Sequence, residues 1–254
     1  MAPERIALIS DIHGNVTALN AVLHDIAGRG ISRILNLGDV IGKGPRGAEA
    51  IEISRSACEA TARGNWDSFI SRDAVQPFPH AQWTRDQLSS ADLDWLSQLP
   101  NVLEFCLSGR RIRLFHASQA SEFVRVRSSH TELEFRSMFS NTEFTGPFSV
   151  HGAPPDATPD VVGYGDIHGS YLKVHEGLML FNVGAVGNHL DAPSAPYVIL
   201  EGVTEGPASS PFSVAFVRVD YDIEAEIAIA RERGMPDAEA YAMELVAGKY
   251  RGDT

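Results

Sequence analysis

Residues 6–15, which read Ile-Ala-Leu-Ile-Ser-Asp-Ile-His-Gly-Asn, decide the fold of this chain. An apolar run that enters a turn of small and polar residues before an amphipathic segment is typical of a buried parallel strand followed by a loop and a helix. In open α/β sheets, the loops after the strands carry the chemistry. If the turn is extended, Asp11 and His13 project toward one point, where a carboxylate oxygen and an imidazole nitrogen make half of a metal site.

The rest of the chain repeats this alternation of strand and helix. Apolar residues recur at helical spacing from Ala18 to Ile26, and Gly28 ends the pattern. The βαβ rhythm that follows indicates a parallel sheet. We expect strands at about 6–9, 31–37, 59–62, 102–107, 112–116, 161–163, 171–175, 178–182, 197–201 and 214–219, and helices at about 18–26, 48–56, 132–139, 223–233 and 238–246.

Two segments interrupt the rhythm. Residues 69–100 are punctuated by prolines and have apolar residues spaced as in short helices, which predicts an inserted helical cap. Residues 118–160 are polar and irregular, with one expected helix and a loop rich in Gly and Pro. A chain of 254 residues can bury a full core. We therefore expect one domain, 1–254, with cap insertions at about 69–100 and 118–160.

Composition limits the partners of the chain. Its 21 Lys and Arg residues against 33 Asp and Glu residues give a formal net charge of −12, which repels a phosphate backbone at long range. We therefore expect no duplex nucleic acid as a partner. A small phosphorylated substrate, including a nucleotide, remains compatible because bound cations offset the negative charge locally. A homodimer is an open alternative for the assembly.

Cysteine usage and the start of the chain bear on location. Cys58 and Cys106 lie in apolar stretches without a partner at disulfide or metal-motif spacing, so we expect buried thiols in a reducing compartment. The short stretch before the first strand leaves no room for a signal peptide, and no apolar run approaches the length that spans a membrane. The sequence thus predicts a cytoplasmic protein with no membrane partner.

Polar side chains follow several of the expected strands. The carboxyl ends of parallel strands gather at one edge of a sheet, so groups far apart in the sequence converge there. A mixed set of oxygen and nitrogen donors suits two cations such as Mn, Fe, Zn or Ni. The candidate residues are Asp11 with His13, Asp39, Asn65, His116, and Asp166 with His168.

At these residues the sequence resembles the calcineurin-like metallophosphoesterase superfamily, whose loops read D-x-H, G-D, G-N-x-D or G-N-H-E, a lone His, and G-H-x-H. The order and rough spacing match over nearly the whole chain. The sequence is most similar to a small bacterial branch, through G-D-x-x-G-x-G-P at Gly38–Pro45 and N-x-G-S-V-G at Asn182–Gly187. The resemblance implies an α/β fold, a two-sheet αββα sandwich with an inserted helical cap, and a metal-dependent hydrolase of phosphoester bonds.

The resemblance also implies which residues hold two metals. Asp11, His13, Asp39 and His168 would hold the first, and Asp39 would bridge it to a second. Two cations roughly 3.5 Å apart share a hydroxide whose pKa they lower, orient it toward phosphorus and neutralise the phosphoryl oxygens. We expect Mn or Fe, with Zn or Ni as alternatives. The second metal would rest on the residues that we name as catalytic, which are Asp39, Asn65 and His116.

Three residues depart from the family pattern. Asp166 replaces the first His of G-H-x-H, a ligand of the second metal. Its oxygen can still ligate and would favour Mn or Fe over Zn; the alternatives are a weakened second site or a carboxylate that caps its own loop. Trp66 replaces a His that protonates the leaving group, which favours nucleotide or aryl leaving groups that need little protonation. Ala185 replaces the usual Ser, so that hydroxyl is not essential here.

Three cationic side chains are candidates for substrate binding. Lys43 stands four residues after Asp39, where related serine/threonine phosphatases carry an Arg that binds phosphate; the alternative is a solvated surface lysine. Arg125 and Arg127 can meet a phosphate from the cap, or face solvent as isolated arginines usually do. We expect Asp67 to order its own loop rather than contact substrate.

The leading functional hypothesis is a dinuclear phosphoesterase that uses a metal-bridging hydroxide on a phosphodiester or nucleotide-type phosphoester. The resemblance also allows a dinucleoside polyphosphate hydrolase or a serine/threonine protein phosphatase, and a deep capped pocket would favour the former. A further alternative is a catalytically weak metal-binding scaffold that keeps the fold, as one subunit of the retromer coat does. Asp166 is the feature that supports this last alternative.

Overall fold

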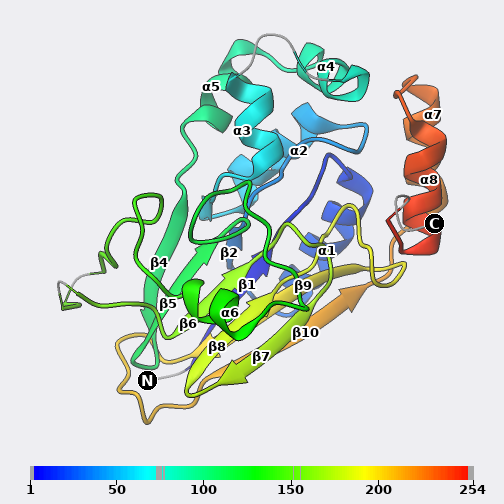
Figure 1. Ribbon diagram of the computed structural model, residues 1–254. Helices are drawn as coiled ribbons and strands as arrows, with labels where there is room; N and C mark the ends of the chain where they lie inside the picture. Colours follow the sequence, from blue (N-terminus) through cyan, green and yellow to red (C-terminus); the bar gives the residue numbers. More distant parts are fainter. Residues whose placement is uncertain (1–2, 73–75, 77, 151, 155, 251–254) are drawn as a thin grey trace.

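Two five-stranded sheets lie against each other, with helices on their outer faces (Figure 1). This computed structural model describes residues 3–72, 76, 78–150, 152–154 and 156–250. The layers run helix, sheet, sheet, helix, so the expected α/β class and αββα sandwich are confirmed.

The first sheet takes strands from both ends of the chain. At its centre, β1 (Glu4–Ile9) pairs in parallel with β2 (Arg33–Asn36), and β2 pairs in parallel with β3 (Ala60–Thr61). On the other side of β1 lies β9 (Ala195–Gly202), antiparallel to it, followed by β10 (Ser213–Val219). The carboxyl ends of β1, β2 and β3 therefore lie at one edge.

The second sheet has a parallel centre between antiparallel edges. Its order is β4 (Val102–Leu107), β5 (Arg110–Phe115), β6 (Val161–Tyr164), β8 (Leu178–Asn182) and β7 (Tyr171–His175). Strands β5, β6 and β8 run parallel, so their carboxyl ends also share an edge. Backbone hydrogen bonds join the loops of the two sheets, among them Val186 N–H to Ser10 O (2.9 Å). The two edges thus meet in one place.

The alternation of side chains along β1 explains the layering. Ile6 and Leu8 are fully buried against residues of the second sheet such as Leu114, whereas Ala7 and Ile9 face the helices. Burial on both faces makes this strand a continuous apolar run rather than an alternating one. Full burial of each Ile or Leu side chain stabilises the fold by about 1.5–3 kcal/mol, and β1 contributes such side chains to both cores.

Helices that follow the strands of the first sheet cover its outer face. The first begins directly after the loop of residues 10–15 that follows β1, which we call the metal loop because it carries Asp11 and His13. The side chain of Asn15 accepts a hydrogen bond from the backbone N–H of Ala18 (3.0 Å) and satisfies a free donor of the first turn. These helices are α1 (Val16–Gly28), α2 (Gly47–Ala57), α3 (Asn65–Arg72) and α5 (Ser90–Ser97).

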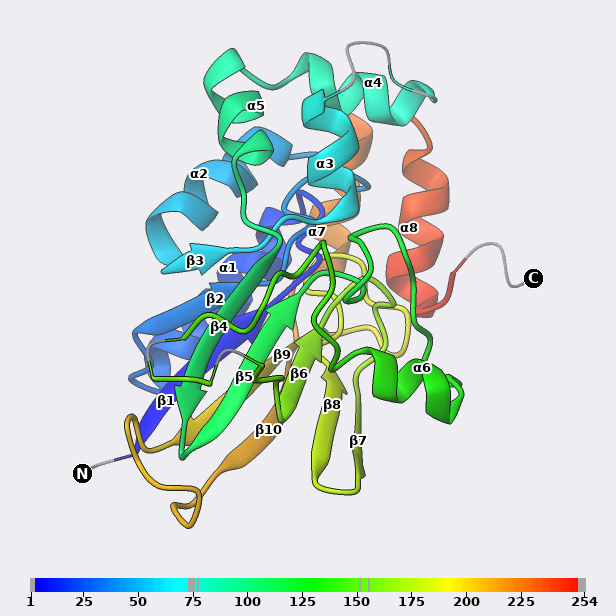
Figure 2. The same ribbon diagram turned by 60° about the vertical axis from the view of Figure 1, so that its left-hand side comes forward.

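The remaining helices stand around the edge where the loops meet (Figure 2). α6 (Glu132–Ser137) covers the outer face of the second sheet through Phe135. α7 (Ile223–Glu232) and α8 (Ala238–Ala247) pack against each other at the end of the chain. α4 (Pro79–Asp86) reaches them through His80, whose Nδ1 lies 2.9 Å from the carbonyl oxygen of Pro236.

The first predicted insertion, 69–100, takes in the end of α3, which already begins at Asn65, and all of α4 and α5, and the second contains α6. Residues 73–75, 77, 151 and 155 of these insertions lie outside the described residues. Ile70 and Leu96 of the first insertion join the same apolar cluster as α1, so these helices also extend the outer helical layer. The description of the chain as one domain with two caps remains a prediction.

Most predicted elements agree with the structure to within a few residues. The hairpin is tighter than expected, since β5 already begins at Arg110. The expectation that both thiols are buried is wrong for Cys106 in β4, which is partly buried, whereas burial raises the pKa of the Cys58 thiol, in the residue that follows α2. Within the described residues, the helices are too short or too polar to cross a bilayer.

Candidate metal centre

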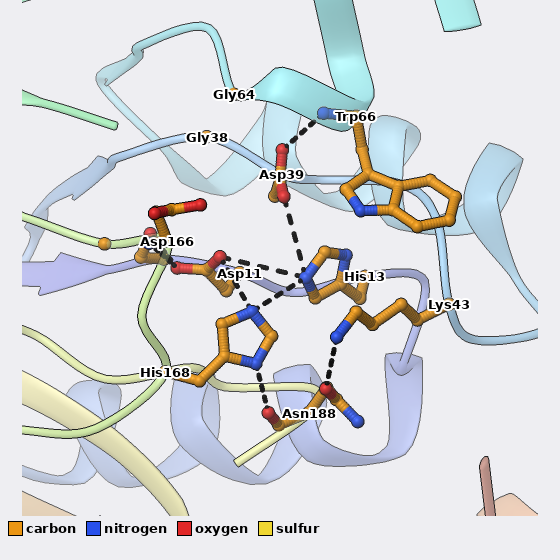
Figure 3. Close-up of polar contacts among 12 residues, drawn as sticks. Asp11, His13, Gly38, Asp39, Lys43, Gly64, Trp66, Asp166, His168 and Asn188 are labelled. Atoms are coloured by element: carbon orange, nitrogen blue, oxygen red, sulfur yellow. Dashed lines mark hydrogen bonds and ion pairs between the residues drawn. The ribbon is translucent and has the colours of Figure 1, made fainter. Parts of the chain in front are cut away.

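Except for Asn65, the first residue of α3, the candidate ligands come from loops at the shared edge of the two sheets (Figure 3). Asp11 and His13 follow β1, and Asp39 follows β2. His116 directly follows β5, and His168 follows β6. These ligands are at most 4% exposed. The structure thus brings these side chains together at strand ends, as the sequence pattern predicted, but from two sheets and not from one.

The loops reach this arrangement through a backbone conformation that the sequence analysis did not anticipate. Asp11 and His13 have φ angles of 54° and 50°, so the turn is left-handed at both residues and not extended. Asp39, Asp166 and His168 are also left-handed, with φ angles of 54°, 64° and 61°. Residues with side chains rarely adopt this region, and such strain concentrates at functional sites. The side chains of Asp11 and His13 therefore converge without the extended turn on which the sequence argument made their convergence conditional.

Backbone carbonyl groups orient the three histidine rings. The Nδ1 atom of His13 lies 3.1 Å from the carbonyl oxygen of Ile41, and that of His116 lies 2.9 Å from the carbonyl oxygen of Leu37. His168 makes the same contact with the carbonyl oxygen of Asn188. A carbonyl can only accept, so each Nδ1 carries a proton and each Nε2 is the ring atom that faces the carboxylates. The three rings are prepared to bind a cation through Nε2.

Two carboxylates lie between these rings. Asp11 Oδ1 is 3.2 Å from His168 Nε2 and 3.7 Å from His13 Nε2. Asp39 Oδ2 is 3.6 Å from His13 Nε2 and 3.5 Å from His116 Nε2. Ligand atoms within 4.8 Å of one another form two groups, Asp11 with His13 and His168, and Asp11 with Asp39 and His116. The groups share Asp11, while the bridging role expected of Asp39 remains a prediction.

Unpartnered polar atoms show that these residues fit a metal. Asp11 Oδ1, Asn65 Oδ1 and His116 Nε2 are buried without a hydrogen-bond partner. His13 Nε2 and His168 Nε2 lie only 3.1 Å apart, which sets two lone pairs against each other. Buried polar atoms normally have partners, so each of these contacts is costly as it stands. A divalent cation would satisfy the orphaned atoms, and a cation or a proton is needed between the two rings.

Electrostatics support this interpretation. Burial, together with the neighbouring His168, lowers the pKa of His13 well below its ordinary value, so its ring is neutral at pH 7. Burial alone would raise the pKa of Asp11, but the surrounding histidines hold it below its ordinary value. Burial opposes charge on His116 too, yet the charge of Asp39 raises the pKa of His116 well above its ordinary value. A metal at Asp39 and His116 would take the place of that proton.

Asp67 holds two of the loops in place. Its carboxylate accepts hydrogen bonds from the backbone N–H groups of Asp39 (2.8 Å), Val40 (3.0 Å) and Gly64 (3.0 Å). A Cβ at Gly64 would lie 2.1 Å from Asp39 Oδ1, so only glycine allows this approach. Burial raises the pKa of Asp67 to about 7. Asp67 thus orders its loop, as expected, and also positions Asp39.

Asp166 is paired with an arginine of the cap. Arg125 Nε lies 2.8 Å from Asp166 Oδ2, and Arg125 Nη2 lies 2.8 Å from Asp166 Oδ1. The backbone N–H of Asp166 donates to Asp11 Oδ2 (3.0 Å). The two ligand groups above do not include Asp166. Its role as a metal ligand remains an untested prediction.

A cavity of about 880 Å³ lies over the metal centre. Its wall includes His13, Asp39, Asn65, Asp166 and His168. All three predicted substrate-binding residues also line it, namely Lys43, Arg125 and Arg127. Lys43 is only partly exposed, and its Nζ donates to Asn188 Oδ1 (2.8 Å).

Several residues of this site were missed by the sequence analysis. Asn188 carries the carbonyl for His168 and the amide oxygen for Lys43, and its Nδ2 donates to Glu244 Oε2 (3.0 Å). Asn188 follows a strand end, as the predicted ligands do, so the same signal could have found it. Glu244 and Tyr241 of α8 line the cavity. Nothing local in the sequence marks a C-terminal helix as part of a site 50 residues or more away along the chain.

Comparisons with known proteins agree with this architecture. The family model of the calcineurin-like phosphoesterase superfamily domain matches residues 5–205. An uncharacterized protein of Methanocaldococcus jannaschii is 29% identical over 248 residues, which cover 88% of this chain and 90% of that protein. The crystal structure of a metallophosphoesterase from Sphaerobacter thermophilus has a TM-score of 0.74 and 27% identity over 97% of this chain and 99% of that chain. A hypothetical protein from Pyrococcus horikoshii shares the fold, with a TM-score of 0.72 and 16% identity over 95% and 97% of the two chains.

Proposed function

The chain belongs to the calcineurin-like phosphoesterase superfamily and is a hydrolase of phosphoester bonds, and we propose that it acts with two metals on a small phosphodiester or nucleotide-type phosphoester. One observation carries the two-metal proposal. Two overlapping groups of buried carboxylates and imidazoles present ligand atoms that lack hydrogen-bond partners.

The family binds divalent metal, and the residues at the shared edge fit that requirement. Bound divalent cations lower the pKa of a water and neutralise the phosphoryl oxygens. For their identity we propose Mn or Fe, with Zn or Ni as alternatives, because carboxylate and amide oxygens stand beside the imidazoles. Asp11, His13, Asp39 and His168 would hold one metal, and Asp39, Asn65 and His116 would hold the second, so that both sets include Asp39.

Side chains of the cavity would bind and orient the substrate. Lys43, Arg125 and Arg127 line it and supply positive charge for phosphoryl oxygens. Asn188 holds the Lys43 ammonium at its place in the cavity wall. The cavity volume of about 880 Å³ is in the range of small-molecule sites, which supports a small substrate over a folded protein.

The leaving-group side of the site differs from the G-N-H-E motif of some family branches. Trp66 lines the cavity where some branches carry a proton-donating histidine. Its backbone N–H donates to Asp39 Oδ1 (2.8 Å), and its ring lies edge-on to His13 with centroids 6.0 Å apart. An indole is a donor only and is not an acid at neutral pH. This supports nucleotide or aryl leaving groups, which depart with little protonation.

A metal analysis and a substrate screen test the proposal. The purified protein should retain divalent transition metal and, with added Mn²⁺, hydrolyse p-nitrophenyl phosphate, its bis ester or a dinucleoside polyphosphate. Asp39→Asn should lower turnover by at least about two orders of magnitude, because it weakens a charge that both metals need. Asp94→Asn, an exposed change on α5, should retain full activity. Metal binding without hydrolysis of any of these esters would instead favour a scaffold.

A further inference from the structure

The ion pair between Asp166 and Arg125 uses both carboxylate oxygens. The contacts are parallel, from Nε and Nη2 of the guanidinium, at 2.8 Å each. The Asp166 side chain is 4% exposed, whereas that of Arg125 is 48% exposed and lines the cavity. A guanidinium has five N–H donors, and this fork uses two of them. The others remain for a ligand in the cavity.

The backbone of Asp166 is fixed independently of this pair. Its N–H donates to Asp11 Oδ2, and its φ angle of 64° is left-handed. A Cβ at the preceding Gly165 would lie 2.1 Å from Ser10 Oγ and 2.5 Å from Asp11 Oδ2, so the chain is pressed against the metal loop. The carboxylate of Asp166 is therefore held at the edge of the metal centre while it contacts Arg125.

The segment that carries Arg125 is anchored separately as well. Val126 is buried in the apolar cluster of the second sheet, and its carbonyl oxygen accepts a hydrogen bond from the Tyr164 hydroxyl (2.8 Å). Loss of the ion pair would thus leave the backbone on both sides of it in place. What would change is the position of the guanidinium.

Charge explains why this position matters. Asp11, Asp39 and Asp166 lie close together (Figure 3), and their carboxylates repel an anionic phosphoester wherever bound cations do not offset their charge. Arg125 offsets the charge of Asp166 and presents its remaining N–H groups to the cavity. Guanidinium groups bind phosphoryl oxygens in the same planar geometry as carboxylates, and such charged hydrogen bonds are short and strong.

We propose that Asp166 is a positioning residue, which holds the Arg125 guanidinium beside the metal centre so that it binds a phosphoryl oxygen of the substrate. The inference rests on the proposed function for its substrate class. It assigns Asp166 a partner in the cap in place of a metal. If Asp166 has this role, the second metal would be held by Asp39, Asn65 and His116, and the loop after β6 would supply no ligand to it.

A double-mutant cycle read by ligand binding tests the proposal. The probe is inorganic phosphate, titrated calorimetrically into Mn²⁺-loaded protein, with metal content measured by mass spectrometry. Asp166→Asn and Arg125→Ala should each weaken phosphate binding about tenfold, the usual effect of losing a charged hydrogen bond. The double variant should bind no more weakly than either single one, because both changes remove the same interaction. Metal content should be unchanged throughout.

Asp160→Asn is the matched control. Asp160 accepts the same fork from Arg111, with contacts of 3.0 and 2.6 Å, ahead of β6 and away from the shared edge. The Asp160→Asn variant should have the phosphate affinity and the metal content of the wild-type protein. Thermal unfolding of each variant verifies that it is folded. Arg125→Lys keeps the positive charge but cannot make two parallel hydrogen bonds to Asp166, so it should bind phosphate with intermediate affinity.

Three outcomes would overturn the proposal. Loss of metal in Asp166→Asn would make Asp166 a ligand. Unchanged phosphate affinity in Asp166→Asn, or effects that add in the double variant, would mean that Arg125 acts without it. None of these readouts requires turnover. If the wild-type protein binds phosphate and metal but hydrolyses no ester, the proposed function is wrong. The phosphate-binding cycle still decides whether Asp166 positions Arg125.

Discussion

At the metal centre, the protein holds side chains through one atom and leaves another atom of the same side chain available for a ligand. The histidine rings are fixed through Nδ1 by backbone carbonyl groups, and the Asp39 loop is fixed by the carboxylate of Asp67. His189 belongs to a similar network, although it is not a predicted ligand. Its Nε2 lies 3.1 Å from the Tyr221 hydroxyl, which also accepts a hydrogen bond from Asn15 (3.2 Å), the cap of α1.

Because the imidazole of His189 is buried, we expect the protein to lose stability in acid. Burial lowers its pKa from 6.5 to about 4, although Asp191 works in the opposite direction. The unfolded chain therefore binds more protons between these values, and the free energy of unfolding falls as the pH drops from 6.5 toward 4. Between pH 7 and pH 5 the loss due to His189 should be about 2 kcal/mol.

Urea unfolding at both pH values measures this effect. His189→Gln should remove that part of the pH dependence, so the gap in stability between wild type and variant should narrow at pH 5. His24→Gln, a change at an exposed histidine of α1, should keep the wild-type pH dependence. An equal loss in wild type and His189→Gln would disprove the assignment.

At the scale of elements, the C-terminal helix α8 is part of the site although it follows the last strand. Glu244 and Tyr241 line the cavity, and Glu244 accepts a hydrogen bond from Asn188, which in turn accepts one from Lys43. The loop after β8 thus connects a helix at the end of the chain to a cation from the loop after β2. Lys43 sits at this junction with a φ angle of 24°, a strained value for a residue with a side chain.

Asn188→Ala should separate substrate binding from metal binding. The variant loses the amide oxygen that holds Lys43 but keeps the backbone carbonyl that orients His168. We expect KM for p-nitrophenyl phosphate to rise about tenfold with metal content unchanged. Asn20→Ala on the exposed face of α1 is the control. A fall in metal content with unchanged KM would show that Asn188 serves the histidine alone.

At the scale of the whole molecule, the metal centre joins the two sheets. Asp11, His13 and Asp39 belong to loops of the first sheet, and His116 and His168 to loops of the second. A ligand that contacts both sheets binds only the assembled sandwich. Its binding free energy therefore adds to the stability of the fold.

Metal removal should lower the melting temperature. Metal at 100 times its Kd stabilises by about 2.7 kcal/mol, which corresponds to about 5–10 °C for a chain of this size. A calorimetric scan before and after chelation measures the shift, and Mn²⁺ should restore the original value. Asp39→Asn should show a smaller shift. A melting temperature that is indifferent to chelation would contradict a metal bound between the sheets.

The fold and the location of the centre were predictable because their signals are local. A buried parallel strand is an apolar run, and the polar residues after it mark its carboxyl end, so Asp11, Asp39 and His168 could be placed at one edge without knowing any contact. The family motifs at the same loops added the expected ligand set. The left-handed turn at Asp11 and His13 escaped this reasoning, since both are ordinary residues whose strain comes from the packing of neighbouring loops.

The sequence by itself thus determined the sandwich, the edge where the loops meet and the candidate ligands. Only the tertiary structure decided which partners these residues have. Asp166 meets Arg125 across 41 residues of chain, and Asn188 meets Lys43 across 145. The physical reason is that periodicity and turn composition record the environment of each residue within its own element. Ion pairs and cavity walls depend on how distant elements pack, which no local pattern records.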